Sequence, residues 1–182
     1  MNDLDRLKQY PTTEKQRSFE WDFTKGVENY EVWDEIEIGA SGTGARTYRI
    51  EEEDVVDFNK AALETDPSMV DLDYARANGV LKFHPLFTVQ IAFYCVDTGI
   101  GSWIRTPGAR NPGQVIDLVE PYQIGEEITA TITHDDKWVR RGNYYMRDKV
   151  EFRNEHGTLK TTWFVTLLLP KTREDVQRFA SA

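Results

Sequence analysis

The spacing of hydrophobic and polar positions changes along the chain, from a helical period in the first half to the alternation of strands in the second. Between residues 51 and 62, the apolar side chains of Val55, Phe58 and Ala62 recur at helical spacing. The acids at 51–54 occupy the first turn, where negative charge suits the positive end of a helix dipole. We therefore predict an amphipathic helix in this segment.

An Asp-Pro turn and a second helix are predicted to follow. Pro67 ends the first helix, because the residue before a proline disfavours helical backbone. The second helix is short. It is predicted to begin at Asp71, whose side chain is a suitable N-cap, and to end at Gly79.

A strongly apolar segment comes next. Pro85 suits the first turn of a helix, where its missing N–H costs nothing. Gly99 and Gly101 close the segment. Almost every position from Pro85 to these glycines is apolar: Leu86, Phe87, Val89, Ile91, Ala92, Phe93, Cys95 and Val96. A helix that is apolar on all sides is a buried one, so we expect this helix to need cover on every side.

From residue 113 onward the pattern is that of strands. Four extended runs are predicted, at 113–123, 126–136, 143–157 and 158–170. Turns at 123–125 and 154–157 predict antiparallel hairpins. The last run is apolar on both faces, which is typical of a central strand or of one covered by a partner. A short terminal helix is predicted over 171–182.

These elements predict an α+β fold of the hotdog type, in which a curved antiparallel sheet wraps around a buried central helix. We expect one domain over 33–170, preceded by an extension over 1–32 that packs on the domain or on a partner. The domain should open with a strand, a glycine-rich loop and a second extended piece. No lysine follows the loop and no helix opens directly after it, so we interpret it as a turn and not as a phosphate site. Side-by-side dimerisation is expected to complete the burial of the central helix.

Composition restricts the partners and the compartment. The chain has 182 residues and a formal charge of −9, which argues against nucleic-acid binding because phosphate recognition needs clustered cations. Cys95 is the single cysteine, so no internal disulfide forms and a reducing compartment is expected. No apolar run reaches the roughly 20 residues that span a bilayer, and the N-terminus lacks the apolar core of a signal peptide. We predict a cytoplasmic protein without membrane or nucleic-acid partners.

Four segments have an order and spacing that resemble one family. They are YRIEEEDVVDF at 48–58, DPSMVDLDYARANG at 66–79, FHPLFTVQIA at 83–92 and EPYQIGEEITATI at 120–132. In these segments the chain resembles the MaoC-like hydratases and dehydratases, which include R-specific enoyl-CoA hydratases. It is most similar to their N-terminal dehydratase-type branch. The resemblance covers about residues 33–170 and supports the hotdog prediction.

The resemblance implies addition of water to an enoyl thioester, or its removal, and suggests where the catalytic groups stand. Active members carry Gly-Asp-x-Asn-Pro-x-His between the two helices. In register with Pro67, Glu64 replaces the catalytic Asp, Asp66 replaces the Asn, and Met69 stands in the place of the His. The reaction needs a carboxylate and an imidazole to move its protons, and a thioether does neither. The alternative is that Glu64 and Asp66 are solvated turn residues, with Asp66 capping the next helix.

The start of the apolar helix departs from the family in a second way. The family has a His-Gly there, whose backbone N–H holds the thioester oxygen, whereas this chain has His84-Pro85. Proline has no N–H, so the N–H of Leu86 or Phe87 is expected to act instead. We predict that both residues, with Met69, contact the substrate.

Two interpretations of the His84 side chain remain open. In the first, the ring packs at the helix start and hydrogen-bonds a loop carbonyl. In the second, His84 supplies the imidazole that Met69 cannot, and pairs with Glu64 or Asp66. The second hypothesis makes Glu64, Asp66 and His84 the candidate catalytic residues.

A basic cluster of Lys137, Arg140 and Arg141 stands out in this acidic chain. The resemblance implies that it holds the phosphates of coenzyme A or phosphopantetheine; the alternative is a hairpin with a charged tip. His134 and His156 lie in polar turn contexts and are predicted to be surface residues. The histidines and the cysteine show no metal-ligand spacing, so no metal site is predicted. No cofactor is expected except coenzyme A as part of the substrate.

Two functions from different classes remain. The first is an acyl-CoA hydratase or dehydratase with a degenerate motif, active as a homodimer. The second is a catalytically silent hotdog subunit that binds acyl-CoA and pairs with an intact partner in a heterodimer or heterotetramer. A hotdog thioesterase is less favoured, because the matching loop is MaoC-like. A bulky or cyclic acyl group is suggested by the aromatic candidates Phe83, Phe87, Phe93, Tyr94 and Trp103.

Overall fold

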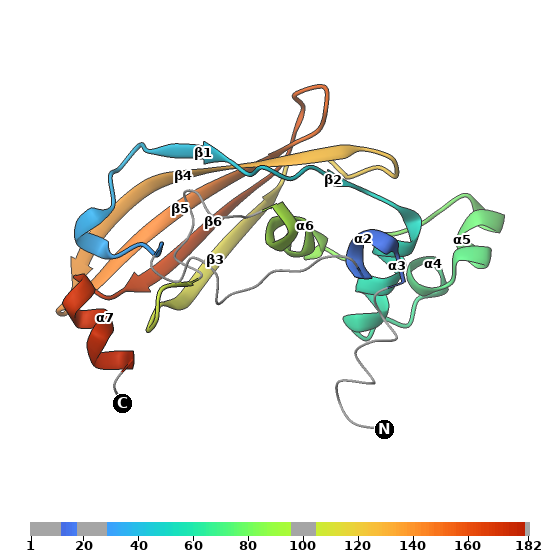
Figure 1. The fold of residues 1–182 in the computed structure, drawn as a ribbon. Coiled ribbons are helices and arrows are strands. Elements are labelled where there is room, and N and C mark those ends of the chain that lie inside the picture. Colours follow the sequence, from blue (N-terminus) through green and yellow to red (C-terminus); the bar gives the residue numbers. More distant parts are fainter. Residues whose placement is uncertain (1–11, 18–28, 96–104, 181–182) are drawn as a thin grey trace. The chain divides into compact units, whose positions relative to one another are not determined.

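The computed structural model describes residues 12–17, 29–95 and 105–180, and these fall into two compact units (Figure 1). The first unit contains Tyr48–Tyr94 and Tyr122–Ile128 together with the N-terminal segment, and the second contains the rest. No helix among the described residues is long and apolar enough to cross a bilayer.

An antiparallel sheet forms most of the second unit, and its strands run side by side in Figure 1. The order is β1 (Ser41–Thr43), β4 (Glu127–Arg140), β5 (Asn143–Arg153), β6 (Leu159–Leu169) and β3 (Arg110–Leu118). Neighbouring strands are antiparallel along this path. A further short strand, β2 (Tyr48–Arg49), pairs with the first residues of β4 within the first unit. The predicted antiparallel sheet is confirmed.

Two connections in the sheet are tight hairpins. β4 and β5 meet at Arg141 and Gly142, whose φ values of 52° and 77° are the positive angles that a two-residue type I′ turn requires. β5 and β6 meet where the Asn154 side chain accepts the N–H groups of His156 and Thr158. This second hairpin was predicted, and so was the central position of β6, which pairs with both β5 and β3.

The hairpin predicted at 123–125 is wrong. β3 pairs with β6, whereas β4 pairs with β1, β2 and β5, so the strands that flank this turn are not neighbours. Gly125 does turn the chain, with φ of 90°, and its N–H donates to the Ile50 carbonyl. The local sequence marked the change of direction, but pairing between distant segments decided which strand the chain joined.

The start of the second unit also differs from the prediction. Trp33–Glu35 is a 3₁₀ turn, η1, and not a strand; the Trp33 N–H donates to the carbonyl of Pro170, just before the terminal helix α7 (Arg173–Ala180). Arg173 in turn donates to the Glu35 carboxylate at 2.7 Å. The predicted terminal helix is confirmed, and it holds η1 in place.

The glycine-rich loop contains β1, which pairs with residues 131–133 of β4. Gly44 follows this strand, and a Cβ there would lie 2.2 Å from the Cys95 carbonyl oxygen. Glycine is therefore required by a close approach of two backbone segments, which agrees with a structural role for this loop.

The remaining helices belong mainly to the first unit, and Figure 1 shows α2 to α5 grouped together. They are α2 (Glu14–Arg17), α3 (Glu52–Ala61), α4 (Pro67–Val70), α5 (Leu72–Asn78) and α6 (Phe87–Cys95). A capping box formed by Glu51 and Asp54 starts α3. The Asp71 carboxylate accepts the Tyr74 N–H to start α5, and Gly79 ends it with φ of 64°. The prediction for α5 is confirmed at both ends.

Helix α6 buries one face only. A buried stripe at helical spacing runs along it: Phe87, Thr88, Ile91, Ala92 and Cys95. Phe93 and the preceding Leu86 are 44% and 45% exposed. Burial on every side is therefore wrong for this chain by itself, and apolar surface remains on α6 that a partner can cover. The last part of the predicted segment, 96–104 with Trp103, lies outside the described residues.

The described part of the N-terminal extension is bound to two buried acids of α3. Thr12 donates from its N–H and its hydroxyl to the Asp57 carboxylate, at 2.9 and 2.6 Å. Asp54 accepts hydrogen bonds from three further side chains of the segment: Thr13, Lys15 and Gln16. Burial raises the pKa of Asp57, although the hydrogen bonds from Thr12 oppose this change. We call Thr12–Arg17 the N-terminal clasp.

Candidate active site

The loop between α3 and α4 carries the first two candidate residues. After α3 ends at Ala61, Leu63 adopts φ of 64°, a left-handed conformation that costs less for glycine than for other residues. Leu63 stands where the family motif has its glycine, and its side chain is exposed. The turn places Glu64 against the end of α3, where its N–H donates to the Asn59 carbonyl at 3.0 Å.

Glu64 and His84 lie beside each other within the first unit. Glu64 Oε1 and His84 Nε2 are 3.6 Å apart, and the two side chains are 34% and 18% exposed. The other ring nitrogen, Nδ1, accepts the Leu86 N–H at 3.0 Å. In the neutral ring, the proton is therefore on Nε2, which faces the carboxylate. Of the two partners expected for His84, the structure brings Glu64 to it.

Asp66 has other partners. Its Oδ1 accepts the N–H and the hydroxyl of Ser68, at 2.9 and 2.7 Å, and so caps α4. Its Oδ2 accepts the Lys82 ammonium at 2.9 Å. The hydrogen bond from Lys82, followed by those from Ser68, lowers the pKa of Asp66 to about 2. Asp66 thus has the capping contact that the sequence offered as an alternative, and a carboxylate this acidic is a weak base at neutral pH.

Met69 and three residues that were not predicted complete the local frame. Met69 is buried in α4, and its carbonyl accepts the Asn59 side-chain amide at 2.8 Å. The unpredicted residues are Asn59, Ser68 and Lys82. The sequence held a signal for Asn59, because it follows Val55 by one helical turn and so lies on the inward face of α3.

The N–H groups at the start of α6 already have acceptors inside the turn. Leu86 donates to the ring of His84, and Phe87 donates to the His84 carbonyl at 2.9 Å. Either group would have to leave its acceptor to hold a thioester oxygen. The Phe87 side chain is buried against the rings of Phe83 and Tyr122, at centroid distances of 5.4 and 6.4 Å. These aromatic side chains therefore fill the interior of the first unit.

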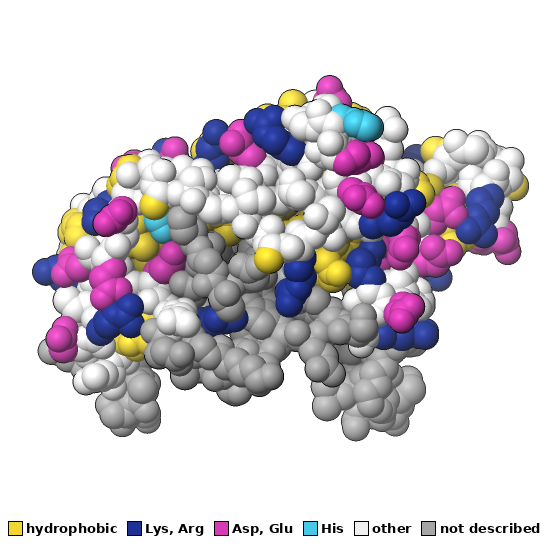
Figure 2. All heavy atoms as spheres, turned by 45° about the horizontal axis from the view of Figure 1, so that its top comes forward, with side chains coloured by type: hydrophobic (Ala, Val, Ile, Leu, Met, Phe, Trp, Pro, Cys, Tyr) yellow, Lys and Arg dark blue, Asp and Glu magenta, His cyan; other side chains and the backbone are white. Residues whose placement is uncertain are grey.

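The three members of the basic cluster have different environments in the second unit. Lys137 donates to the Ile36 carbonyl at 2.9 Å and lies over the Trp33 ring, 4.6 Å from its centroid. Arg140 and Arg141 are exposed at the tip of the β4–β5 hairpin. Figure 2 shows cationic and anionic side chains interspersed over one face of the molecule, with no broad area of one sign. The arginines are thus the accessible part of the cluster.

The prediction that His134 is a surface residue is wrong. Its side chain is 4% exposed, and its Nδ1 lies 2.7 Å from the Asp148 carboxylate, which is fully buried. Its Nε2 lies 3.2 Å from the Glu31 carboxylate. Burial disfavours the charged ring, but hydrogen bonds with Asp148 and Glu31 outweigh this cost and raise the pKa of His134 to about 9. The strand continues past the predicted turn, so His134 falls on the inward face of β4. His156, in contrast, is 77% exposed, as predicted.

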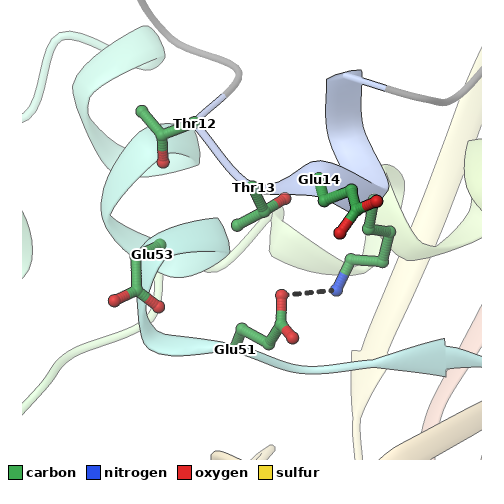
Figure 3. A pocket seen from close by; sticks show the side chains of 6 residues that line it. Thr12, Thr13, Glu14, Glu51 and Glu53 are labelled. Atoms are coloured by element: carbon green, nitrogen blue, oxygen red, sulfur yellow. Dashed lines mark ion pairs between the residues drawn. The ribbon is translucent and has the colours of Figure 1, made fainter.

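An open, polar cavity of about 590 Å³ lies beside the start of α3 (Figure 3). It is lined by Thr12, Thr13, Glu14, Lys15, Glu51 and Glu53. Figure 3 shows the Glu51 carboxylate turned toward a lysine ammonium of the clasp, at 3.6 Å. None of the predicted catalytic residues lines this cavity, and three glutamates make it unsuitable for coenzyme A phosphates.

Comparison with known proteins agrees with the family resemblance. No family model matches the chain. The chain is 29% identical over 106 residues to an (R)-specific enoyl-CoA hydratase of Rhodospirillum rubrum, in a match that covers 56% of this chain and 67% of the relative. Its fold is similar to that of a monoamine oxidase regulatory protein of Archaeoglobus, with a TM-score of 0.65, 23% identity, and coverage of 79% of this chain and 96% of the other. A MaoC-like dehydratase from R. rubrum gives a TM-score of 0.63 with 16% identity, over 78% of this chain and 98% of the other.

The antiparallel sheet and its accompanying helices, matched to these structures, define an α+β protein with the hotdog fold. The chain is thus similar in part of its sequence to an (R)-specific enoyl-CoA hydratase, and similar in fold to a MaoC-like dehydratase. Two further proteins of similar fold, both from Mycobacterium tuberculosis, were solved as complexes of two different subunits. They are the HadBC 3R-hydroxyacyl-ACP dehydratase and the ChsH1–ChsH2 complex, with TM-scores of 0.60 and 0.53.

Proposed function

We propose that this chain is a hydro-lyase that adds water to an enoyl thioester, or removes it from a 3-hydroxyacyl thioester, with Glu64 and His84 as its acid–base pair. The observation that supports this proposal is the arrangement of the two side chains. A carboxylate and the protonated nitrogen of an imidazole lie 3.6 Å apart, on side chains that are both partly exposed. The (R)-specific enoyl-CoA hydratase relative supports the class of reaction.

The pair supplies both proton transfers of the hydration. The Glu64 carboxylate takes a proton from water as the water oxygen bonds to the β-carbon of the enoyl group. The electron pair of the carbon–carbon double bond moves to the α-carbon, which takes the proton from His84 Nε2 and leaves the neutral ring as a short-lived imidazolate beside the newly protonated Glu64. The proton on Glu64 then passes to His84, and the pair is ready for another turnover. Dehydration follows the same steps in reverse.

The other candidates take supporting roles in this proposal. Asp66, with its low pKa, remains ionised and holds Lys82 and the start of α4, so it stays near the reacting groups without exchanging a proton. In this proposal, Met69, Leu86 and Phe87 contact the acyl portion of the substrate. Arg140 and Arg141 bind the coenzyme A phosphates. Neutralising both arginines should then weaken acyl-CoA binding at low salt more than at high salt.

The test is an assay of the purified chain with crotonyl-CoA and with longer and aromatic enoyl-CoAs, followed by loss of the conjugated absorbance. We expect turnover, and we expect the substitution Glu64→Gln to reduce kcat by about a hundredfold, in the range typical of general acid–base groups. Glu53→Gln is the matched control, because Glu53 is an exposed glutamate of α3 whose carboxylate lies 3.8 Å from Arg76. Absence of turnover with every substrate, or full activity of Glu64→Gln, rejects the proposal.

A second candidate function is that of a silent subunit that pairs with an intact hydratase. It is favoured by Met69 in the place of the motif histidine and by the apolar surface along β3. Within the described part of the chain, β3 has one hydrogen-bonded neighbour, β6. Val115, Leu118 and Val119 are more than half exposed on or just beyond it. An exposed apolar edge strand is a surface on which another chain can pair.

Co-expression with a complete hotdog hydratase separates the two candidates. If the chain is a silent subunit, activity appears only in the co-purified complex, and Glu64→Gln leaves that activity unchanged. If the chain is an enzyme, activity is present without the partner and is lost in Glu64→Gln. Light scattering of each preparation measures the number of subunits.

A further inference from the structure

One fully buried polar side chain connects the two members of the proposed acid–base pair. Asn59, on α3, has no exposed surface. Its main-chain carbonyl accepts the N–H of Glu64 at 3.0 Å, and its side-chain oxygen accepts the N–H of His84 at 3.1 Å. The backbones of both residues are thus hydrogen-bonded to the same residue.

The amide nitrogen of the same side chain donates hydrogen bonds to two neighbouring segments of the backbone. Asn59 Nδ2 donates to the Met69 carbonyl at 2.8 Å and to the Lys82 carbonyl at 2.9 Å. Both N–H groups of the amide and its oxygen therefore have partners, which a buried amide requires. The partners lie in α4 and in the segment that leads to α6, so three stretches of chain are held at one point.

We infer that Asn59 is a positioning residue that fixes the separation of Glu64 and His84. This inference rests on the proposed function. Proton transfer depends steeply on distance, and a displacement of about 1 Å can reduce a rate by about a hundredfold. An aliphatic residue at position 59 would leave the Met69 and Lys82 carbonyls and the His84 N–H without this partner.

The experiment compares Asn59→Ala with the wild-type chain by steady-state kinetics and by amide hydrogen exchange. We expect kcat for enoyl-CoA hydration to fall by roughly tenfold to a hundredfold with little change in KM, because geometry and not substrate contact is altered. We also expect the His84 N–H to exchange much faster, while amides of β4, β5 and β6 keep their protection. The control is Asn78→Ala, since Asn78 is an exposed asparagine whose side chain donates to the Tyr74 carbonyl.

Two outcomes overturn the inference. One is wild-type kcat with unchanged exchange at His84. The other is faster exchange throughout the sheet, which would make Asn59 a general contributor to stability. If Asn59→Ala does not fold, hydrogen exchange of the wild-type chain provides the test. The N–H groups of Glu64 and His84 should then be protected from exchange to a similar degree. Rapid exchange of either N–H rejects the inference. An inactive wild-type chain rejects the proposed function, whereas the exchange result still shows whether Asn59 holds His84.

Discussion

Two histidines of this chain face carboxylates, and they differ in how far their rings are enclosed. His84 lies 3.6 Å from Glu64, and both side chains are partly exposed. His134 is enclosed between Asp148 at 2.7 Å and Glu31 at 3.2 Å. The enclosed ring keeps its proton at neutral pH because its pKa is raised to about 9. A catalytic imidazole needs access and a proton that it can release, so the presence of acids near a histidine is not sufficient evidence for chemistry.

The largest effect should come from removing the enclosed histidine. His134→Ala removes the protonated ring from between the buried Asp148 carboxylate and the nearby Glu31. Loss of one partner from a buried ion pair typically costs about 3–5 kcal/mol of unfolding free energy. Urea denaturation followed by circular dichroism measures this value. A loss of unfolding free energy below about 1 kcal/mol, the range of a surface ion pair, would show that His134 is accessible to solvent. The contrast with His84 would then disappear.

The pH dependence of stability should report the same group. The pKa of His134 is raised from an ordinary value of 6.5 to about 9 in the folded protein. Its contribution is therefore complete below about pH 6.5 and is lost as the pH rises through about 9. A shift of this size corresponds to about 3 kcal/mol. Urea unfolding at pH 6 and at pH 10 measures the loss, and the His134→Ala variant should lack this part of the pH dependence.

The accessible histidine should show the opposite behaviour. We expect His84→Ala to reduce enoyl-CoA hydration by about a hundredfold while leaving the urea midpoint nearly unchanged, because the ring acts as an acid and supports little of the fold. His156→Ala is the control, since His156 is largely exposed. Full turnover by His84→Ala would assign the ring to packing against Phe58, 5.5 Å away between centroids.

The smallest effect is expected at Asp66. Asp66→Asn keeps an oxygen that accepts the Ser68 N–H, so the cap of α4 survives while the ion pair with Lys82 is lost. Hydration should stay within about fivefold of wild type, because surface ion pairs contribute little. A loss as large as that of Glu64→Gln, measured in the same assay, would show that Asp66 does more than cap α4 and takes part in the reaction.

Local signals in the sequence were sufficient for elements that are set by nearby residues. Asp71 and Gly79 bound a helix wherever it packs, and the Asn154 turn closes its hairpin through its own side chain. Prediction failed where distant residues decide. The turn at 123–125 did not reveal that β3 joins β6, because that pairing depends on segments far apart in the chain.

The candidate site was predictable in part for the same reason. The family motif located Glu64 and Asp66, and His84 was proposed because the motif imidazole is missing. The choice between the two acids depended on Lys82, which forms an ion pair with Asp66. The error at His134 was avoidable. Ile128, Ala130 and Ile132 alternate inward along β4, and extending that alternation by one step would have placed His134 inside.

The clasp at Thr12–Arg17 has a consequence for anyone who prepares this protein. Residues 1–32 were predicted to be an extension outside the domain, and trimming them would be a natural first step to improve expression or crystals. In such a shortened chain, the buried Asp54 and Asp57 would lose the hydroxyl, amide and ammonium groups that donate hydrogen bonds to them. Poor yield or inactivity of the trimmed product would then reflect damage at α3 and would say nothing about the catalytic competence of the intact polypeptide.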